Sequence, residues 1–304
     1  MRLRPFRLLP SFREKVWGST KLEPWFPNWA QKIGEVWFGF DENRTSLGAT
    51  VRELMERHGE ALLGTAVTPG YRGCFPILVK FIFTSERLSV QVHPEDAYSQ
   101  RHENSPGKTE MWHLLRTEPG AEIAAGFRRP LTRERLIESA ASGEIERLIE
   151  WFDVRPGQTF FTPPGTVHAL GAGLALCEIQ QNSDITYRLY DYGRPRPLHV
   201  EKAAEVACLD RHPGPAPAPP RDGKTHLLAS CRYFATELLQ PAERSQYRGD
   251  PERFHLLMVL EGSGTAGSTL LAPGEVWLVP ASTGEFVLLA RPGTRLLRIQ
   301  VPPA

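Results

Sequence analysis

Short apolar runs, bounded by glycine, proline and small polar residues, recur along most of the chain. Runs of this length that are rich in β-branched and aromatic residues are typical of β-strands. The pattern therefore predicts a mainly β protein. In the first two thirds of the chain the runs are "FPILVKFIF" (75–83), "RLSVQVH" (87–93), "EMWHLL" (110–115), "EIAAGF" (122–127), "QTFFTPP" (158–164), "LALCEIQ" (174–180) and "DITYRLY" (184–190).

Two segments, 47–64 and 130–152, instead place their apolar residues three and four positions apart. This spacing predicts helices, and Thr132 is placed to cap the start of the second one. Many short strands with helices to one side favour a β-barrel or a double-sheet roll.

The segment 211–223, "RHPGPAPAPPRDG", interrupts the strand pattern. Proline and alanine at this density neither form a hydrogen-bonded ladder nor bury an apolar face, so we predict a semi-rigid linker. Residues 1–210 then form one unit that contains both helical segments. Residues 224–304 form a second, smaller β unit, and because no histidine follows Pro280 there, we expect it to lack a metal site.

The run 87–93 carries three polar side chains at every second position, namely Ser89, Gln91 and His93. In a strand these three leave the same face, while the apolar residues between them leave the other. Glu110 ends the motif "GKTE" at the start of another strand, and His168 follows the turn "PPGT". Two imidazoles, a carboxylate and an amide oxygen suit a divalent metal, with zinc preferred over iron or manganese. Taken singly, each histidine is better explained as an ordinary hydrogen-bonded residue, and only the set favours a metal.

Lys80 interrupts the apolar run 75–83. A buried ammonium group is costly unless it faces a polar cavity or a partner of opposite charge. The residue is therefore either part of a polar site or a lysine on an edge strand whose ammonium group reaches solvent.

Composition and charge narrow the class of protein. The chain has 304 residues and a formal net charge of +1, which gives no reason to expect nucleic-acid or anionic-membrane binding. Its apolar runs are too short to cross a bilayer, and its basic N-terminus has no long apolar core, so we predict a cytoplasmic protein. The four cysteines form no CxxC pair, which favours buried thiols over disulfides.

Five motifs in series resemble the type I mannose-6-phosphate isomerase family, in its short bacterial form, within the cupin superfamily. The resemblance implies a cupin barrel, a double-stranded β-helix or jelly roll with helical insertions, followed by a smaller, degenerate cupin-like β domain. It also implies a metal-dependent aldose–ketose isomerase that interconverts mannose 6-phosphate and fructose 6-phosphate through an enediol(ate). The motifs are "VWGSTKL" (16–22), "LSVQVHPEDAY" (88–98), "GKTEMWHLL" (107–115), "PPGTVHAL" (163–170) and "CEIQQNSDITYRLYDYGR" (177–194).

The resemblance also implies residue roles. The metal is zinc, one ion per chain, with other divalent metals as alternatives, and its ligands are Gln91, His93, Glu110 and His168. The catalytic positions are Glu178, Asp184 and Arg188, and the substrate-binding positions are Lys80, Ser89, Lys108 and Arg194. Among these, Ser89 corresponds to a phosphate contact. By their charge, Lys108 and Lys80 are also suited to the phosphate, and Arg188 is suited to the enediolate. Glu178 is a candidate base, in competition with a water held by the metal, or else an ion-pair partner of Arg188 without a proton role.

Other functions remain open at this point. Two histidines and a carboxylate on a cupin barrel also describe non-haem iron oxygenases, which need no phosphate anchors. A non-catalytic sugar-phosphate-binding protein could use the same pocket, but it would not need every metal ligand. An isomerase of related sugars is a third possibility. We favour the sugar-phosphate isomerase, acting as a monomer or homodimer with a small-molecule substrate.

Overall fold

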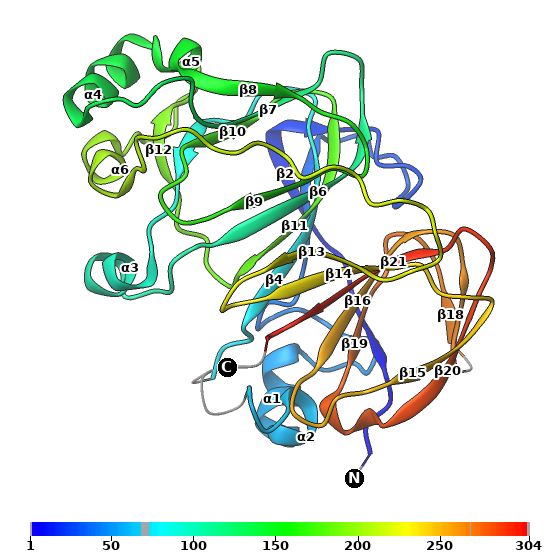
Figure 1. Ribbon diagram of the computed structural model, residues 1–304. Helices are drawn as coiled ribbons and strands as arrows, with labels where there is room; N and C mark the ends of the chain where they lie inside the picture. Colours follow the sequence, from blue (N-terminus) through cyan, green and yellow to red (C-terminus); the bar gives the residue numbers. More distant parts are fainter. Residues whose placement is uncertain (1, 68–72, 268, 303–304) are drawn as a thin grey trace.

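A computed structural model describes residues 2–67, 73–267 and 269–302 of the chain. The protein is mainly β, as the sequence pattern predicts, and its strands form four antiparallel sheets (Figure 1). No helix among the described residues is long and apolar enough to span a membrane.

Two sheets face each other in the first unit. The six-stranded sheet has the order β2-β3-β4-β11-β6-β9, and the five-stranded sheet has the order β12-β5-β10-β7-β8. Apolar side chains from both sheets, including Ile82, Leu114 and Ile123, pack between them. The bounds are β2 (Ser11–Ser19), β3 (Ile33–Phe38), β4 (Ile77–Phe83), β5 (Val90–Val92), β6 (Glu110–Thr117), β7 (Glu122–Phe127), β8 (Ile149–Asp153), β9 (Thr159–Thr162), β10 (His168–Leu170), β11 (Leu174–Gln181) and β12 (Tyr187–Tyr190).

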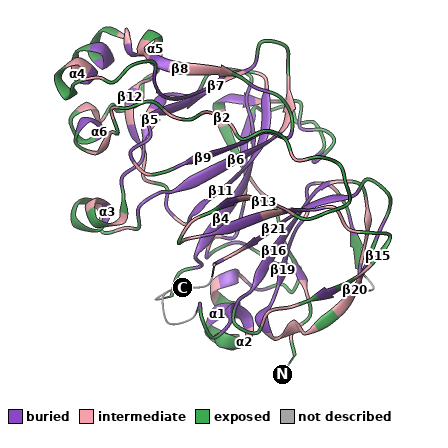
Figure 2. Ribbon diagram, in the orientation of Figure 1, coloured by how far each residue is buried: buried purple, intermediate pink, exposed green. Residues whose placement is uncertain are grey.

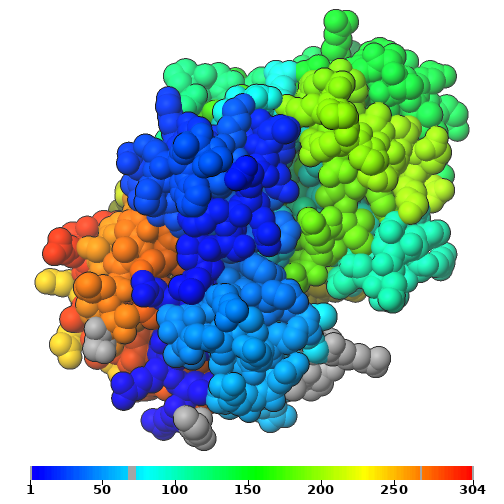
Figure 3. Space-filling model, turned by 180° about the vertical axis from the view of Figure 1, so that it is seen from behind, coloured from blue at the N-terminus to red at the C-terminus, as the bar shows by residue number. Residues whose placement is uncertain are grey.

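A second pair of sheets contains the C-terminal strands. Its six-stranded sheet has the order β1-β19-β16-β21-β14-β13, and its four-stranded sheet has the order β15-β20-β17-β18. The bounds are β1 (Phe6–Leu8), β13 (His226–Ser230), β14 (Ala235–Leu239), β15 (Arg244–Arg248), β16 (His255–Glu261), β17 (Gly264–Ala266), β18 (Thr269–Leu271), β19 (Val276–Val279), β20 (Glu285–Ala290) and β21 (Arg295–Gln300). Strand β1 thus joins this sheet although it comes from the N-terminus, and Figure 3 shows the blue N-terminal residues against the orange C-terminal strands.

The two six-stranded sheets belong to one continuous core. Phe81 and Ile179 of the first sheet share an apolar cluster with Leu256 and Leu297 of the second. Every residue of β4 is buried, because one face of this strand packs in that cluster and the other faces the opposite sheet (Figure 2). This burial on both faces explains why 77–83 is an almost unbroken apolar run, interrupted on its inner face by Lys80.

The helices lie on the outside of the sheets (Figures 1 and 2). Thr50 caps α1 and forms a capping box with Glu53, so the predicted helix at 47–64 begins where its polar residues satisfy the first backbone amides. Gly59 then separates α1 from α2. The bounds are α1 (Val51–His58), α2 (Glu60–Leu63), α3 (Asp96–Glu103), α4 (Arg133–Ser142), α5 (Ile145–Leu148) and α6 (Val200–Val206), with a short 3₁₀ turn at Ala281–Thr283.

The predicted helix at 130–152 is too long. Thr132 caps α4 as expected, but Gly143, with φ +78°, ends that helix in the left-handed conformation. Residues 149–153 then form strand β8, which pairs with β7. The prediction failed there because the apolar residues of "IEWF" (149–152) continue the helical spacing of the residues before them. Their pairing with β7 depends on tertiary contacts, which the sequence pattern does not show.

Residues 211–223 contain no helix or named strand and lie along the first unit, with isolated bridges between Arg211 and Gly126 and between Ala216 and Thr159. The division into units 1–210 and 224–304 stays a prediction. Strand β1 belongs to the first unit by sequence but pairs with β19 of the second.

Candidate metal centre and active-site cavity

Strand register brings three predicted site residues into one row. His168 of β10 lies directly opposite Gln91 of β5, and Arg188 of β12 lies opposite Gln91 on its other side. His93 immediately follows β5, and Glu110 begins β6 in the facing sheet. Side chains from the two facing sheets therefore converge in the space between them.

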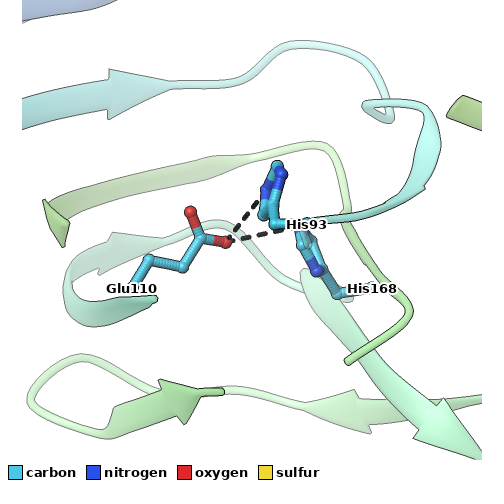
Figure 4. A group of neighbouring side chains, drawn as sticks. All are labelled: His93, Glu110 and His168. Atoms are coloured by element: carbon cyan, nitrogen blue, oxygen red, sulfur yellow. Dashed lines mark ion pairs between the residues drawn. The ribbon is translucent and has the colours of Figure 1, made fainter. Parts of the chain in front are cut away.

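His93, Glu110 and His168 form a buried cluster (Figure 4). The Oε1 atom of Glu110 lies 3.6 Å from Nε2 of His93 and 3.3 Å from Nε2 of His168. One potential ligand atom of each residue lies within 4.8 Å of those of the other two. This spacing is small enough for one ion to contact all three.

Hydrogen bonds to the backbone determine which imidazole nitrogens are protonated. Nδ1 of His93 lies 2.7 Å from the carbonyl oxygen of Ile185, and Nδ1 of His168 lies 2.9 Å from that of Thr166. A carbonyl oxygen only accepts, so each Nδ1 is the donor, and in the neutral ring Nε2 is left with a lone pair. Both lone pairs therefore lie beside the Glu110 carboxylate, and Nζ of Lys108 lies 3.1 Å from Nε2 of His93.

The electrostatics keep these groups in their metal-binding forms. Burial lowers the pKa of His168 to about 3 and also lowers the pKa of His93. Burial acts to raise the pKa of Glu110, but Lys108 and His93 hold it well below its usual value. At neutral pH two neutral imidazoles and a carboxylate thus face one another, an arrangement that a cation stabilises.

Glu110 supplies a test of this interpretation. Neither of its buried oxygens accepts a hydrogen bond of ordinary geometry from a described residue, although Nζ of Lys108 lies 2.9 Å from Oε2. A buried carboxylate without hydrogen-bond donors is costly. The residues present therefore fit a divalent cation, which would supply the missing partner.

Gln91 lies where a fourth ligand is needed. The hydroxyl of Ser89 donates to Oε1 of Gln91 over 3.1 Å, and Nε2 of Gln91 lies 3.2 Å from Nε2 of His168. The two ends of an amide have the same shape, and exchanging them turns Oε1 toward the histidines while Nε2 donates to Ser89. The four predicted ligands thus lie together in the fold.

A second polar row lies on the facing sheet. Nζ of Lys80 donates to Oε1 of Glu178 over 2.8 Å, lies 3.7 Å from Oε1 of Glu35, and sits over the ring of Trp37. The indole of Trp112 donates to the other oxygen of Glu178. Burial acts to lower the pKa of Lys80, but Glu178 and Glu35 together raise it. Lys80 is therefore a buried, paired cation and not a lysine whose ammonium group reaches solvent.

This row corrects one sequence-based alternative for Glu178. Its ion-pair partner is Lys80, whereas Arg188 has no carboxylate within 4 Å among the described residues. Strand register explains why Glu178 pairs with Lys80 and not with Arg188. Glu178 and Lys80 lie directly opposite each other on the adjacent strands β11 and β4.

One cavity connects both polar rows with the predicted catalytic residues. Its lining brings together residues from both sheets and from the segment after β12. Asp184 is exposed at this cavity, and Arg188 lies among the lining residues. The lining residues are Lys15, Trp17, Glu35, Lys80, Ile82, Leu88, Ser89, Gln91, Lys108, Trp112, His168, Leu170, Glu178, Asp184, Thr186, Arg188 and Arg196.

Arg194 does not line this cavity. Its guanidinium group binds Glu86, Asp191 and the carbonyl oxygen of Arg87 instead. Arg196, two residues later, takes the place beside the cavity that the resemblance implied for Arg194. The sequence offers no signal that distinguishes two arginines in "GRPRP".

Glu35 was also missed, although its position could have been found. It alternates with Val36 in "IGEVWF", so a strand places it on the face opposite Val36 and Phe38, both of which are fully buried. A carboxylate on the inner face of a strand is a candidate partner for a buried lysine.

A network of hydrogen bonds fixes the segment that carries Lys108 and Glu110. Oδ1 of Asp96 accepts from the backbone amide of Gly107 and from Nε2 of Gln181, each over 2.9 Å. Oε1 of Gln181 in turn accepts from the amide of Thr109 over 2.8 Å. Tyr233, which comes from the second unit, donates to Oδ2 of Asp96 over 2.5 Å.

Comparison with known proteins agrees with this site. A family model described as phosphomannose isomerase type I, catalytic domain, matches residues 5–112. "Mannose-6-phosphate isomerase ManA" of Bacillus subtilis (strain 168) is 35% identical over 311 residues, which cover 95% of this chain and 96% of the relative.

Solved structures give the same result at the level of the fold. The crystal structure of the mannose 6-phosphate isomerase from Bacillus subtilis has a TM-score of 0.85 and 29% identity, covering 98% of this chain and 99% of that one. A mannose 6-phosphate isomerase bound with zinc and yttrium has a TM-score of 0.82 at 19% identity, covering 99% and 100%. Conserved length, sequence and fold together show that this chain belongs to the type I mannose-6-phosphate isomerase family.

Proposed function

We propose that the protein interconverts mannose 6-phosphate and fructose 6-phosphate. The observation that carries this proposal is the convergence of His93, Glu110 and His168, each in its metal-binding form. His168 also lines a cavity that holds cationic and acidic side chains. Family membership supplies the substrate, and the site supplies the groups that the reaction requires.

We propose zinc as the metal, one ion per chain, held by Gln91, His93, Glu110 and His168. Imidazole, carboxylate and amide ligands suit zinc, and a related structure contains it. When bound, the ion supplies a Lewis acid that polarises the carbonyl group of the sugar.

The reaction moves a proton between C2 and C1 of the open-chain sugar. We propose that the carboxylate of Glu178 accepts the proton from C2 and returns it to C1, while the hydroxyl proton of O2 passes to O1. Lys80 and Trp112 each donate to one of its oxygens, so its orientation in the cavity is fixed. The exposed Asp184 lies in the same cavity and is available to the hydroxyl groups of the sugar.

The geometry supports different roles for Lys108 and Ser89 from the phosphate contacts expected from the sequence. Nζ of Lys108 lies 3.1 Å from Nε2 of His93 and 2.9 Å from Oε2 of Glu110, which places it at the metal centre. We therefore propose that Lys108 stabilises the negative charge of the enediolate there. Ser89, hydrogen-bonded to Gln91, would position that ligand and not the phosphate.

The proposed reaction is tested by a coupled assay of fructose 6-phosphate formation from mannose 6-phosphate. Activity should vanish when a chelator removes the metal and return with added zinc. A protein that contains its metal and still shows no turnover would contradict the proposal.

The proposed role of Glu178 is tested by Glu178→Gln, which keeps the shape of the side chain. Loss of the base should lower kcat by roughly a hundredfold or more, with metal content unchanged. Wild-type kcat in the metal-loaded variant would contradict the assignment.

The cytoplasmic location and the choice between monomer and homodimer stay predictions.

A further inference from the structure

Glu35 is a buried carboxylate of the cavity that the proposed reaction does not use. Its Oε1 atom lies 3.7 Å from Nζ of Lys80. Its Oε2 atom accepts from the indole Nε1 of Trp37 over 3.2 Å and lies 3.1 Å from Nζ of Lys15. The two oxygens of Glu35 therefore face two different lysines.

An irregular stretch of β2 brings Lys15 to this carboxylate. Glu14 and Ser19 both pair opposite Ile33 of β3, so the residues between them bulge out of the regular ladder. The side chain of Lys15 crosses the backbone of Gly34, where an added Cβ atom would lie 2.6 Å from Cβ of Lys15. The glycine leaves room for this crossing, and a partly exposed lysine thereby lines the cavity.

Charge alternates along the row that these side chains complete. This charge row consists of Lys15, Glu35, Lys80 and Glu178, which come in turn from the adjacent strands β2, β3, β4 and β11. Burial acts to raise the pKa of Glu35, but Lys80 and Lys15 together hold it below its usual value. Glu35 is therefore an anion at neutral pH, and the ammonium group of Lys80 is shared between two carboxylates.

We infer that Glu35 and Lys15 are positioning residues that set the proton affinity of Glu178 through the charge row. A lysine shared between two carboxylates stabilises each anion less than a lysine that serves only one, and the anion of Glu35 also repels that of Glu178. Both effects favour uptake of a proton by Glu178, whereas the cation of Lys15 limits them. The inference rests on the proposed function, because that function makes Glu178 the base, and a base is most effective near the working pH.

The other groups around Glu178 stay the same when the charge row is altered. Trp112 of β6 donates to Glu178 but does not titrate. The remaining ionisable side chains that line the cavity come from outside the four strands of the charge row. Differences between charge-row variants therefore report the row itself. These side chains are Lys108, His168, Asp184, Arg188 and Arg196.

Two measurements test the inference. The first is the acid limb of the pH dependence of kcat, recorded with the zinc-loaded full-length enzyme and mannose 6-phosphate. The second is ¹³C NMR of the metal-free protein labelled at the side-chain carboxyl carbon of glutamate, with the Glu178 signal identified by its absence from Glu178→Gln. The second measurement does not depend on turnover.

The two ends of the charge row should act in opposite directions. Glu35→Gln removes an anion and keeps the side-chain shape, so both midpoints should fall by about one pH unit. Lys15→Gln removes a cation and should raise both midpoints by roughly half a unit, since Lys15 acts from farther along the row. The matched control is Glu14→Gln, which removes an exposed anion of the same strand outside the cavity and should change neither midpoint. A loss of packing alone would not produce opposite shifts.

The outcomes separate the charge row from the reaction. Unchanged midpoints in Glu35→Gln, or shifts of the same sign in Glu35→Gln and Lys15→Gln, would overturn the inference and leave an active isomerase standing. Opposite shifts of the NMR midpoint in a protein that does not turn over mannose 6-phosphate would support the charge row and overturn the proposed function. Lys15 lies at the solvent-exposed end of the row, so its variant tests the inference even where Glu35→Gln does not fold. There, a midpoint that does not rise would overturn it.

Discussion

Two carbonyl oxygens determine the chemistry of the metal centre at the scale of single residues. Ile185 and Thr166 accept from Nδ1 of the two histidines, so the opposite nitrogens are left for a metal. Outer contacts of this kind orient metal-binding histidines in general. The contact of His93 cannot be recognised in the sequence, because Ile185 is distant along the chain, whereas Thr166 lies two residues before His168 in the same turn.

The lowered histidine pKa values predict an acid-tolerant metal site. A proton competes with the metal only below the pKa of the folded, metal-free histidine. Two ordinary histidines of pKa 6.5 would lose roughly a hundredfold in metal affinity at pH 5.5. With the pKa of His168 near 3 and that of His93 lowered, the loss from protonation of these two ligands should be under about tenfold. Competition with a fluorescent chelator at pH 7.5 and 5.5 measures this, and a hundredfold loss would contradict it.

The buried Lys80 predicts a large effect on stability. Lys80→Met keeps the length of the side chain but leaves Glu178 and Glu35 without their cation. Removing one partner of a buried ion pair typically costs about 3–5 kcal/mol of unfolding free energy. Urea denaturation measures this cost, and the double variant Lys80→Met/Glu178→Leu should recover part of it.

An exposed ion pair is the control for this experiment. Arg248 and Glu285 lie 3.8 Å apart at the surface, and Arg248→Met should leave the urea midpoint unchanged. Equal midpoints for the two single variants would show that the burial of Lys80 carries no special cost.

The predicted metal ligands came from a simple rule, whereas the guanidinium positions did not. Alternation in a strand put Gln91 and His93 on one face, and the structure brings both to Glu110 and His168. The placement of Arg196 instead of Arg194 depends on which arginine Asp191 holds toward the cavity. That choice is made by tertiary contacts in a loop, where no periodicity applies.

At the scale of elements, the segment 107–110 is held by α3 on one side and β11 on the other. Asp96 and Gln181 satisfy its amides, and Tyr233 of the second unit contacts Asp96. Because Asp96 and Gln181 bind the segment that ends at Glu110, side chains outside the cavity help to position a metal ligand.

Tyr233→Phe should therefore weaken metal binding. Removing the hydroxyl takes one donor from Asp96, and loss of such outer partners typically costs about tenfold in metal affinity. Chelator competition measures the affinity of the purified protein. The matched control is Tyr247→Phe, whose hydroxyl contacts His255 within the second unit, far along the chain from the metal ligands. Equal metal affinities in the two variants would contradict the role of Tyr233.

Strands were easier to predict than helices for a physical reason. Strands β4 and β11 are buried along their whole length and are largely apolar, and a short apolar run bounded by turns is a strong local signal. Helix α3 went unrecognised because only Ser99 is buried on it, so "DAYSQRHE" has no apolar stripe. Its position is determined by Asp96, whose carboxylate accepts a hydrogen bond from the amide of Gly107 in the neighbouring loop.

At the scale of the whole molecule, the two six-stranded sheets share one core, and β1 extends that connection. Phe6 and Leu8 are buried, with Phe6 paired opposite Leu278 of β19. Phe6→Ala should lower the unfolding free energy by about 3–5 kcal/mol. Leu9→Ala, at a residue 39% exposed, should have a much smaller effect in the same urea titration. Similar losses in both variants would show that β1 is not anchored through its buried side chains.

The pairing of β1 with β19 has a consequence for how the chain is made. A ribosome produces Phe6 well before Leu278, so β1 has no native partner in its sheet until the residues between β1 and β19 have been made. Contacts this distant in sequence form late and slowly. An unpaired strand is open to pairing with other chains, and Pro5 and Pro10 on either side keep this one to three residues. Strand β1 thus leaves the ribosome long before its partner β19, and its shortness protects the nascent chain in the interval.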